Sequence, residues 1–395
     1  MTFTPSADLR RGFDTAEFVR RSKAVQAVMA AQRLDVILLA SEADICYFTG
    51  FMTQFWQSPT RPWFVMIPAT GAPIAIIPTI GVQLMQSCHV SEVRSWSSPA
   101  ANDDGISLLL QTLGEHLGDR GRLGVMMGRE TAVRLPLGDI LTLKSALDGV
   151  EIVDVTVTIQ QIRMLKSPAE IAKLRHICGC VNAVFDGLPA WATVGLPLSE
   201  VFRQFKIHAL QLGVDDVSYL VGAAGKNGYQ DIIAPPTDRR LQTGDVFMLD
   251  TGCVWDGYFS DFDRNFAVGS ASDEAQTAHH ALYDATEAAL ALVRPGIRAC
   301  DLFVAMATVL RPATEFGAAG DDVGRYGHGL GIQLTEPPSL TVWDKTEIQA
   351  GMALTLEPSM GYGDGYVMVA EENILVTDTG FELLSRRCGR DLEVV

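Results

Sequence analysis

The amino-acid sequence predicts an α/β domain followed by an α+β domain in which helices pack on an antiparallel sheet. The chain has 395 residues, more than one domain usually contains, so two domains are expected. Strand-like and helical segments alternate in the first part, whereas the C-terminal half carries apolar runs that a tight-turn dipeptide joins into a hairpin. We place the boundary near residue 160, which gives domains of residues 1–160 and 161–395.

Helices and strands follow one another in the first domain. Residues 16–33 have apolar side chains at helical spacing and lead into the strand-like run LDVILLA. Three more strand-like runs and one helical stretch follow in chain order: WFVMIP, APIAIIP, residues 105–118 and LGVMM. This alternation is the basis of the α/β assignment.

A helix begins the second domain. Ser167, Pro168 and Glu170 have the pattern of a capping box, in which a serine cap is followed by a proline in the first turn and then by a glutamate. Apolar side chains follow at helical spacing, so the boundary is placed just before this segment. Two more helices are predicted at residues 275–293 and 300–310.

Two apolar runs flank Asp256-Gly257, a dipeptide suited to a two-residue hairpin turn. With that turn, Asp250 lies opposite position 263 and Asp261 lies opposite position 252. Asp250 and Asp261 are then diagonal neighbours on one face, within ~7–8 Å of each other. Buried carboxylates are costly unless they are paired, hydrogen-bonded or metal-bound. We therefore expect both to reach one cation or to bridge two, the alternative being two solvent-facing aspartates.

Three further side chains complete a candidate metal site. His328 lies in the run YGHGLG, whose glycines let the backbone crowd a bound species, and the following residues do not predict the helix that a phosphate-binding loop would open. Glu357 ends the strand-like run MALTLEP, and Glu371 lies inside the strand-like run YVMVAEENILVT. Four carboxylates and one imidazole suit two divalent ions of Mn, Fe, Co or Zn.

The motifs around these residues resemble those of the M24 "pita-bread" family, which includes methionine aminopeptidases, aminopeptidase P, prolidase and creatinase. The segments that carry the resemblance are DTGCVWDGYFSD, GHGLG, LEP and EENILVT. IRMLKSPAEIAKLR resembles the first segment of the family's catalytic domain, and LDVILLASEADICYFTGF resembles its N-terminal domain. The resemblance covers roughly residues 18–387. It implies a creatinase-like N-terminal domain and a C-terminal pita-bread domain.

The resemblance also implies a mechanism. Asp250 would hold one ion, Asp261 and Glu371 would bridge, and His328 with Glu357 would complete the second ion's ligands. Water held between the two ions would attack a C–N bond, either an amide or an Xaa-Pro-like bond, in a dipeptide or small metabolite. Glu357 is the candidate catalytic residue that moves the proton from this water to the departing nitrogen.

Two positions depart from the peptidases of this family. Ile233 and Thr335 stand where those peptidases usually carry substrate-contacting histidines. Isoleucine cannot stabilise or protonate the reacting amide, and threonine offers only a weak hydrogen-bonding group. Val369 also replaces an arginine that is often found before the last glutamate ligand. The metal centre thus resembles the family's, while the substrate-binding groups do not.

Two alternatives to a hydrolase remain open. A metal-dependent lyase of the dimethylsulfoniopropionate lyase type also lacks both histidines, and residues 227–231 are loosely similar to that branch. However, Met248 stands where the lyase has an extra aspartate, and Leu334 or Thr335 stands where it has another. The second alternative is a non-catalytic pita-bread binding module, although such modules typically lose ligands and none is lost here.

Six residues are candidates for contact with substrate. They are Trp56, Arg61, Gln230, Asp231, Thr335 and Glu336. Trp56 and Arg61 lie in an aromatic stretch that we interpret first as the edge of a hydrophobic core; in related two-domain proteins this domain can border the active site of a dimer partner. The pair His279-His280 is expected to be a surface feature of a helix and no second metal site.

Overall composition limits the classes of partner. A formal net charge of −16 argues against nucleic-acid binding, which needs a basic surface. No segment approaches twenty consecutive apolar residues, and the N-terminus lacks the apolar stretch of a signal peptide, so a cytoplasmic protein without membrane contact is expected. Seven scattered cysteines without a CxxC pair predict reduced thiols. The expected partners are a small-molecule or dipeptide substrate and a second copy in a homodimer.

Overall fold

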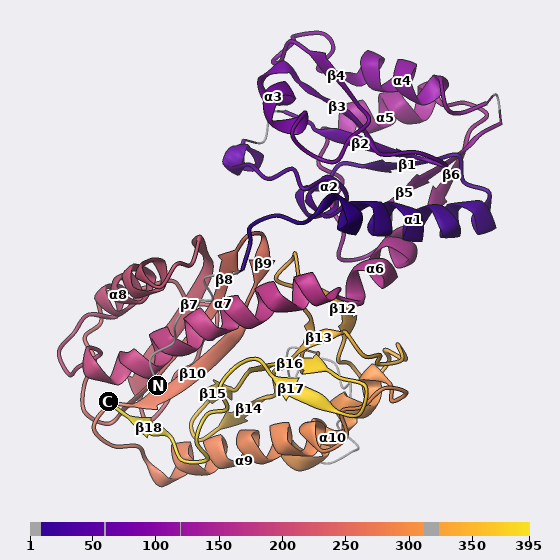
Figure 1. Ribbon diagram of the computed structural model, residues 1–395. Helices are drawn as coiled ribbons and strands as arrows, with labels where there is room; N and C mark the ends of the chain where they lie inside the picture. Colours follow the sequence, from indigo (N-terminus) through magenta and orange to yellow (C-terminus); the bar gives the residue numbers. More distant parts are fainter. Residues whose placement is uncertain (1–8, 59–60, 119, 312–323) are drawn as a thin grey trace. The chain divides into compact units, whose positions relative to one another are not determined.

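The computed structural model describes residues 9–58, 61–118, 120–311 and 324–395 (Figure 1). The chain divides into two compact units, one of residues 10–163 and the other with residues 164–395 as its body. The division falls at the end of helix α6 (Thr156–Met164), and the boundary placed near residue 160 lies inside this helix.

The first unit is an α/β fold, as predicted. Its strands are β1 (Val36–Leu39), β2 (Phe64–Pro68), β3 (Ile74–Pro78), β4 (Glu92–Trp96), β5 (Arg122–Val125) and β6 (Glu151–Asp154). They form one sheet in the order β4-β3-β2-β1-β5-β6 (Figure 1). β2 is antiparallel to both β1 and β3, while the other neighbours are parallel. The sheet is therefore mixed.

Helices account for most of the remaining chain in this unit. They are α1 (Thr15–Gln32), α2 (Glu42–Thr49), α3 (Val82–Met85), α4 (Ile106–Gly114), α5 (Leu137–Ala146) and α6, with 3₁₀ turns η1 (Gln54–Gln57) and η2 (Thr79–Gly81). Every residue of β1, β2 and β3 is buried. This is typical of strands that are covered on both faces, and it explains why their sequences are continuous apolar runs. The helices predicted at residues 16–33 and 105–118 are confirmed as α1 and α4.

The second unit contains the predicted antiparallel arrangement, divided among several sheets. The first five-stranded sheet contains β7 (Asp216–Lys226), β8 (Asp245–Trp255), β9 (Tyr258–Phe259), β10 (Phe262–Ala267) and β18 (Glu393–Val394). The second contains β11 (His328–Gly329), β12 (Glu336–Ser339), β13 (Ala353–Leu356), β16 (Glu372–Val376) and β17 (Phe381–Leu383). β14 (Ser359–Tyr362) and β15 (Tyr366–Val369) form a separate pair. The strand-like run around Glu371 is thus two strands, β15 and β16, which are separated at the acids in its middle.

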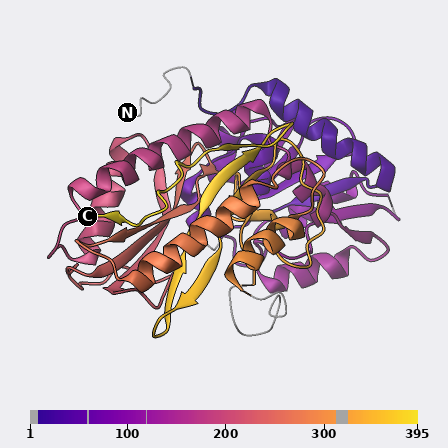
Figure 2. The same ribbon diagram turned by 90° about the horizontal axis from the view of Figure 1, so that it is seen from below.

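Helices lie on both sides of these strands. They are α7 (Pro168–Gly187), α8 (Leu198–Gln211), α9 (Asp273–Leu290) and α10 (Ala299–Leu310), and a 3₁₀ turn, η3 (Leu188–Ala190), follows α7. α7 packs against β8 and β9, whereas α9 packs against β14 and β15. Figures 1 and 2 show α7 and α9 running along opposite sides of the strands. No helix among the described residues is both long and apolar enough to cross a membrane.

Helix α7 anchors the hairpin formed by β8, β9 and β10. The predicted capping box is present, because Ser167 Oγ accepts the N–H of Glu170 and the Glu170 carboxylate accepts the N–H of Ser167. The same carboxylate accepts the hydroxyl of Tyr258 at 2.9 Å. Lys173, one turn further along, forms a buried ion pair with Asp256 in the hairpin turn. The local signal that starts α7 therefore also connects this helix to the hairpin.

The hairpin has the predicted register. Asp256 and Gly257 have φ values of 49° and 81°, the left-handed backbone that a type I′ turn requires at both central positions. Asp250 pairs with Asp263 across the ladder. Val254 pairs with Phe259 in the same register nearer the turn, which leaves Asp261 between β9 and β10 on the face of Asp250.

Candidate metal centre

Side chains from the two five-stranded sheets of the second unit meet around Asp261. Asp261 Oδ2 lies 3.5 Å from His328 Nε2. The same imidazole nitrogen lies 4.0 Å from Glu357 Oε2. One ligand atom each of Asp261, His328 and Glu371 lies within 4.8 Å of the others. The hairpin thus supplies Asp261, while the second sheet supplies His328 on β11 and Glu357 at the end of β13.

The imidazole of His328 is arranged as a neutral ligand. Its Nδ1 lies 2.9 Å from the carbonyl oxygen of Gly329. A carbonyl oxygen only accepts, so Nδ1 carries the proton and Nε2 directs its lone pair toward Asp261 and Glu357. Burial, together with the charge of Arg325, lowers the pKa of His328 to about 4. The side chain is therefore unprotonated at neutral pH.

The carboxylates have the opposite shift. Burial raises the pKa of Asp250 to about 7. Burial and the charge of Asp250 raise the pKa of Glu357 to about 8. For both Asp261 and Glu371, burial and the neighbouring carboxylates raise the pKa well above its ordinary value. Acids held this close together favour whatever neutralises them, either protons or cations.

The residues fit divalent metal ions. Asp250 Oδ1 and Glu371 Oε1 are buried and have no hydrogen-bond partner among the described atoms. The donor set of four carboxylates and one neutral imidazole is one that Mn²⁺, Fe²⁺, Co²⁺ and Zn²⁺ accept. Cations at this position would satisfy the unpaired oxygens and offset the mutual repulsion of the acids.

Several residues that sequence reasoning missed hold the ligands in place. Asn373 accepts the N–H of Asp261 with Oδ1 at 2.9 Å, and its amide nitrogen donates to the carbonyl oxygen of the same residue. Thr355 Oγ1 accepts the N–H of His328 at 3.1 Å. A hydrogen bond with Tyr219 lowers the pKa of Asp250 against the larger effect of burial. The residues that make these contacts lie far along the chain from the ligands, so no local sequence pattern predicts them.

Arg325 is another residue of the site that the sequence analysis did not identify, and it places a positive charge near the acids. Its positive charge lowers the pKa of Asp261 and of Glu357, partly offsetting the effect of burial on each. It is partly exposed and lies close to His328 in the chain. The sequence offered one signal, since the arginine stands three residues before a proposed ligand.

The four substrate candidates of the second unit have different surroundings. Gln230 and Asp231 are exposed in the segment after β7, and Thr335 is partly exposed just before β12. Glu336 is only 2% exposed. Its carboxylate forms an ion pair with Lys166 at 2.9 Å and accepts the N–H of Gln333 at 3.2 Å. Glu336 therefore fixes the segment beside Thr335.

Trp56 and Arg61 belong to the first unit. Trp56 is 6% exposed and packs against Phe51 and Trp63. The Arg61 guanidinium lies 4.9 Å from the centre of the Phe55 ring. These contacts favour the interpretation of the aromatic stretch as part of a hydrophobic core.

The expectation that both His279 and His280 lie on the surface was wrong for His279. It is 3% exposed, and its Nε2 lies 3.1 Å from the carbonyl oxygen of Gly389. His280 is more exposed and pairs with Asp391 at 2.7 Å. The C-terminal segment covers this part of α9, an arrangement that the helix's own sequence does not reveal.

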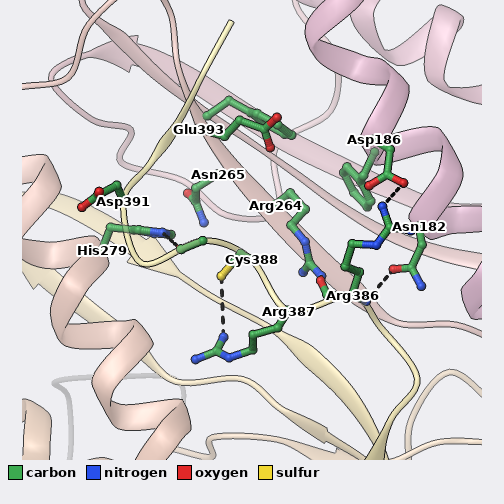
Figure 3. A pocket seen from close by; sticks show the side chains of 13 residues that line it. Asn182, Asp186, Arg264, Asn265, His279, Arg386, Arg387, Cys388, Asp391 and Glu393 are labelled. Atoms are coloured by element: carbon green, nitrogen blue, oxygen red, sulfur yellow. Dashed lines mark hydrogen bonds and ion pairs between the residues drawn. The ribbon is translucent and has the colours of Figure 1, made fainter. Parts of the chain in front are cut away.

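Figure 3 shows a separate cavity of about 100 Å³ between α7, β10, α9 and the C-terminal segment. Arg264, Asn265, Arg387 and Cys388 contribute to its lining, and none of the five proposed ligands does. Successive residues of a strand face opposite sides, so Asp263 faces the acids while Arg264 faces the cavity. The Arg264 guanidinium nevertheless contacts the backbone of a proposed ligand, because it donates to the carbonyl oxygen of Glu371 at 3.0 Å.

Comparisons with known proteins agree with this architecture. The probable dipeptidase PepE of Mycobacterium tuberculosis is 26% identical over 390 residues, which is 98% of each chain. The crystal structure of dipeptidase PepE from Mycobacterium ulcerans is 28% identical, covers 97% of this chain and 99% of its own, and has a TM-score of 0.82. The prolidase structure from Thermococcus sibiricus is 24% identical and shares the fold with a TM-score of 0.84. The match covers 97% of this chain and 100% of the prolidase chain.

Family models match both parts of the chain. The model of the creatinase/prolidase N-terminal domain matches residues 21–165. The model of metallopeptidase family M24 matches residues 172–378, which include Asp250, Asp261, His328, Glu357 and Glu371. The chain is therefore a member of metallopeptidase family M24 with a creatinase-type N-terminal domain.

Proposed function

We propose that this protein is a metal-dependent hydrolase that cleaves a C–N bond in a dipeptide or a small metabolite. The observation that carries the proposal is the convergence of Asp261, His328 and Glu371 within 4.8 Å, together with buried carboxylate oxygens that lack partners. The dipeptidase names of the relatives support a peptide as the first substrate to test.

Five residues would hold two divalent ions of Mn, Fe, Co or Zn. They are Asp250, Asp261, His328, Glu357 and Glu371. When bound, such ions lower the pKa of a coordinated water and polarise a carbonyl group. The chain's own contribution is to present a neutral imidazole from His328 and to keep the carboxylates of Asp261 and Glu371 away from bulk solvent.

Glu357 is suited to move the proton. Its side chain is 25% exposed, whereas those of Asp261 and His328 are nearly buried at 7% and 4%, so Glu357 is the most accessible of the three. Burial and the charge of Asp250 raise its pKa to about 8 in the metal-free protein, so its carboxylate holds a proton more readily than an exposed glutamate does. Glu357 would accept the proton as water forms the new C–O bond, and would donate it to the nitrogen as the C–N bond breaks.

The residues at the two positions that depart from the family's peptidases support a substrate other than a standard Xaa-Pro peptide. Ile233 is 70% exposed and cannot donate a hydrogen bond. Thr335 is partly exposed and offers only a hydroxyl group. Gln230, Asp231 and Thr335 would line the approach to the centre, and Glu336 would act by holding the segment of Thr335.

The test is turnover of a substrate panel by protein loaded with Mn²⁺ or Fe²⁺. The panel contains Xaa-Pro and other dipeptides, creatine-like amides and dimethylsulfoniopropionate, with detection of both released amine and released sulfide. Amine release that depends on added metal supports the hydrolase. No amine from any substrate, by protein that has bound metal, would contradict it.

A metal-dependent lyase is the second candidate, because Ile233 and Thr335 stand at the positions of the usual peptidase histidines while all five proposed metal ligands are present. Sulfide release with no amine release would favour the lyase. Protein that binds no metal and turns over no substrate would instead support a binding module.

We also propose that the protein acts in the cytoplasm as a homodimer of chains with domains of residues 1–160 and 161–395. The homodimer follows from the family resemblance, the cytoplasmic location from the lack of a long apolar segment, and the domain boundary from the capping-box pattern at Ser167. Sedimentation of the metal-loaded protein tests the dimer, and a single monomeric species at micromolar concentration would contradict it.

A further inference from the structure

Asp263 is a third aspartate on the hairpin face that carries proposed ligands. It lies directly across the ladder from Asp250. It also follows Asp261 by two positions in the chain, so the alternation of the strand directs all three side chains to one face. Asp263 is only 2% exposed. Sequence reasoning and the five-ligand pattern both leave it without a role.

The two carboxylate oxygens of Asp263 have different surroundings. Oδ1 accepts the backbone N–H of Glu371 at 2.8 Å. Oδ2 is buried and has no hydrogen-bond partner among the described atoms, like Asp250 Oδ1 and Glu371 Oε1. One oxygen therefore orients a proposed ligand, while the other is unpaired beside the ligands.

The neighbouring arginine does not satisfy this oxygen. The Arg264 guanidinium donates to the carbonyl oxygen of Glu371 at 3.0 Å and to the Glu372 carboxylate at 3.0 Å. Its remaining hydrogen bonds also go to backbone carbonyl oxygens. A buried, ionised carboxylate oxygen without a donor is strongly unfavourable unless a cation reaches it or a proton neutralises it. A divalent ion bound by the neighbouring proposed ligands would supply such a cation.

We propose that Asp263 is a further ligand of the metal centre, in which Oδ2 binds the ion held by Asp250 while Oδ1 positions Glu371. The donor set then contains five carboxylates and one imidazole. Such an oxygen-rich set shifts preference toward Mn²⁺ and away from Zn²⁺. The inference rests on the metal centre of the proposed function and extends it by one ligand and by the class of ion.

Titration of metal-free protein with Mn²⁺, followed by the electron paramagnetic resonance signal of free Mn²⁺, tests the inference. Asp263→Asn removes the charge and keeps an oxygen for the N–H of Glu371. We expect it to weaken Mn²⁺ binding at one site by about ten-fold or more, with a smaller loss for Zn²⁺ in competition.

Asp245→Asn is the matched control. Asp245 is a fully buried acid on the same strand as Asp250 and pairs with Arg239 at 2.6 Å. Its neutralisation should leave Mn²⁺ affinity unchanged. If Asp263→Asn fails to fold, Asp263→Ser keeps a hydroxyl acceptor for Glu371 and is measured in its place.

The structure of the Mn²⁺-loaded wild-type protein gives an independent readout, and Oδ2 should lie in the coordination shell of an ion. Unchanged Mn²⁺ affinity and Mn²⁺/Zn²⁺ preference in the folded Asp263 variant, or Oδ2 outside the coordination shell, would overturn the inference and leave the proposed function intact. Wild-type protein that binds no Mn²⁺ and needs no metal for turnover would overturn both.

Discussion

His328 and Glu357 show how burial prepares single side chains for metal-dependent hydrolysis. Burial lowers the pKa of His328 to about 4, so the imidazole is neutral and can bind a cation through Nε2. Burial and the charge of Asp250 raise the pKa of Glu357 to about 8 in the metal-free protein, so this group holds a proton more readily than an exposed glutamate does. The same physical cause thus has opposite effects on the proposed ligand His328 and on the proposed proton carrier Glu357.

Replacing Glu357 by Gln tests this assignment at the residue scale. At saturating metal, turnover should fall by about 10²–10⁴-fold, because glutamine cannot carry the proton. Glu382→Gln provides the control, since Glu382 is a partly exposed acid that pairs with Arg175 on the surface. Steady-state kinetics with metal content measured on the same samples is the readout. Near-normal turnover by metal-loaded Glu357→Gln would rule out the proposed proton transfer.

Local sequence predicted residue positions well where the signal was itself local. Asp256-Gly257 predicts a two-residue turn, and from this turn the pairing of Asp250 with position 263 follows by counting. Asn373 and Tyr219 were missed because their roles depend on which strands become neighbours. The predicted register identifies position 263 only as the residue opposite Asp250, since nothing in the local sequence shows that the Asp263 carboxylate is buried.

At the scale of elements, helix α7 and the hairpin form a connected support for the acids. Lys173 and Asp256 form an ion pair whose side chains are 2% and 7% exposed. Removing one partner of a buried pair leaves an uncompensated charge, which is more damaging than removing both. The turn that sets the register of Asp250 and Asp261 therefore depends on a residue of α7.

Lys173→Met should lower the free energy of unfolding by about 3–5 kcal/mol. The double variant Lys173→Met with Asp256→Asn should recover part of that loss, because no unpaired charge remains. Chemical denaturation of the three proteins measures the effect. Equal stability of wild type and Lys173→Met would show that the pair does not support the hairpin.

Gly327 allows the strand of His328 to approach its neighbour. Its φ is +129°, and a Cβ added there would overlap the carbonyl oxygen of Thr355. Gly327→Ala should therefore displace His328 and weaken metal binding, with a stability loss of about 1–3 kcal/mol. Gly138→Ala in α5 is the control, since an added Cβ meets nothing within 4 Å. Unchanged metal affinity in Gly327→Ala would contradict the role of this backbone position.

The limits of element prediction also have physical causes. The strand-like run around Glu371 carries acids in its middle, but the run itself does not show that β15 and β16 pair with different partners. His279 was expected on the surface because α9 alone leaves it outside, whereas the C-terminal segment covers it. In both cases the deciding contacts come from chain segments that local sequence cannot identify.

For the whole molecule, the acidic centre should link stability to pH and to metal. The raised pKa values of Asp250, about 7, and Glu357, about 8, exceed their values in the unfolded chain, near 4. The stability that these groups contribute is therefore present below pH ~4 and is lost as pH rises through about 7–8. Bound cations replace the protons and should remove this loss.

Metal-free protein should thus unfold at progressively lower denaturant concentration as pH increases from 5.5 to 8.5. Metal-loaded protein over the same range should change less. Comparing the two at each pH cancels groups such as His279, whose buried, lowered pKa acts in the opposite direction. Parallel pH profiles with and without metal would show that the acids are not neutralised by cations.

Metal content measured by mass spectrometry tests most directly whether residues from two sheets form a centre for two divalent ions. Slowly dialysed wild-type protein should retain about two ions per chain, and Asp261→Ala, which removes a carboxylate beside His328 and Glu371, should lose metal and turnover together. Asp261→Ala protein with wild-type metal content and wild-type turnover would contradict the account.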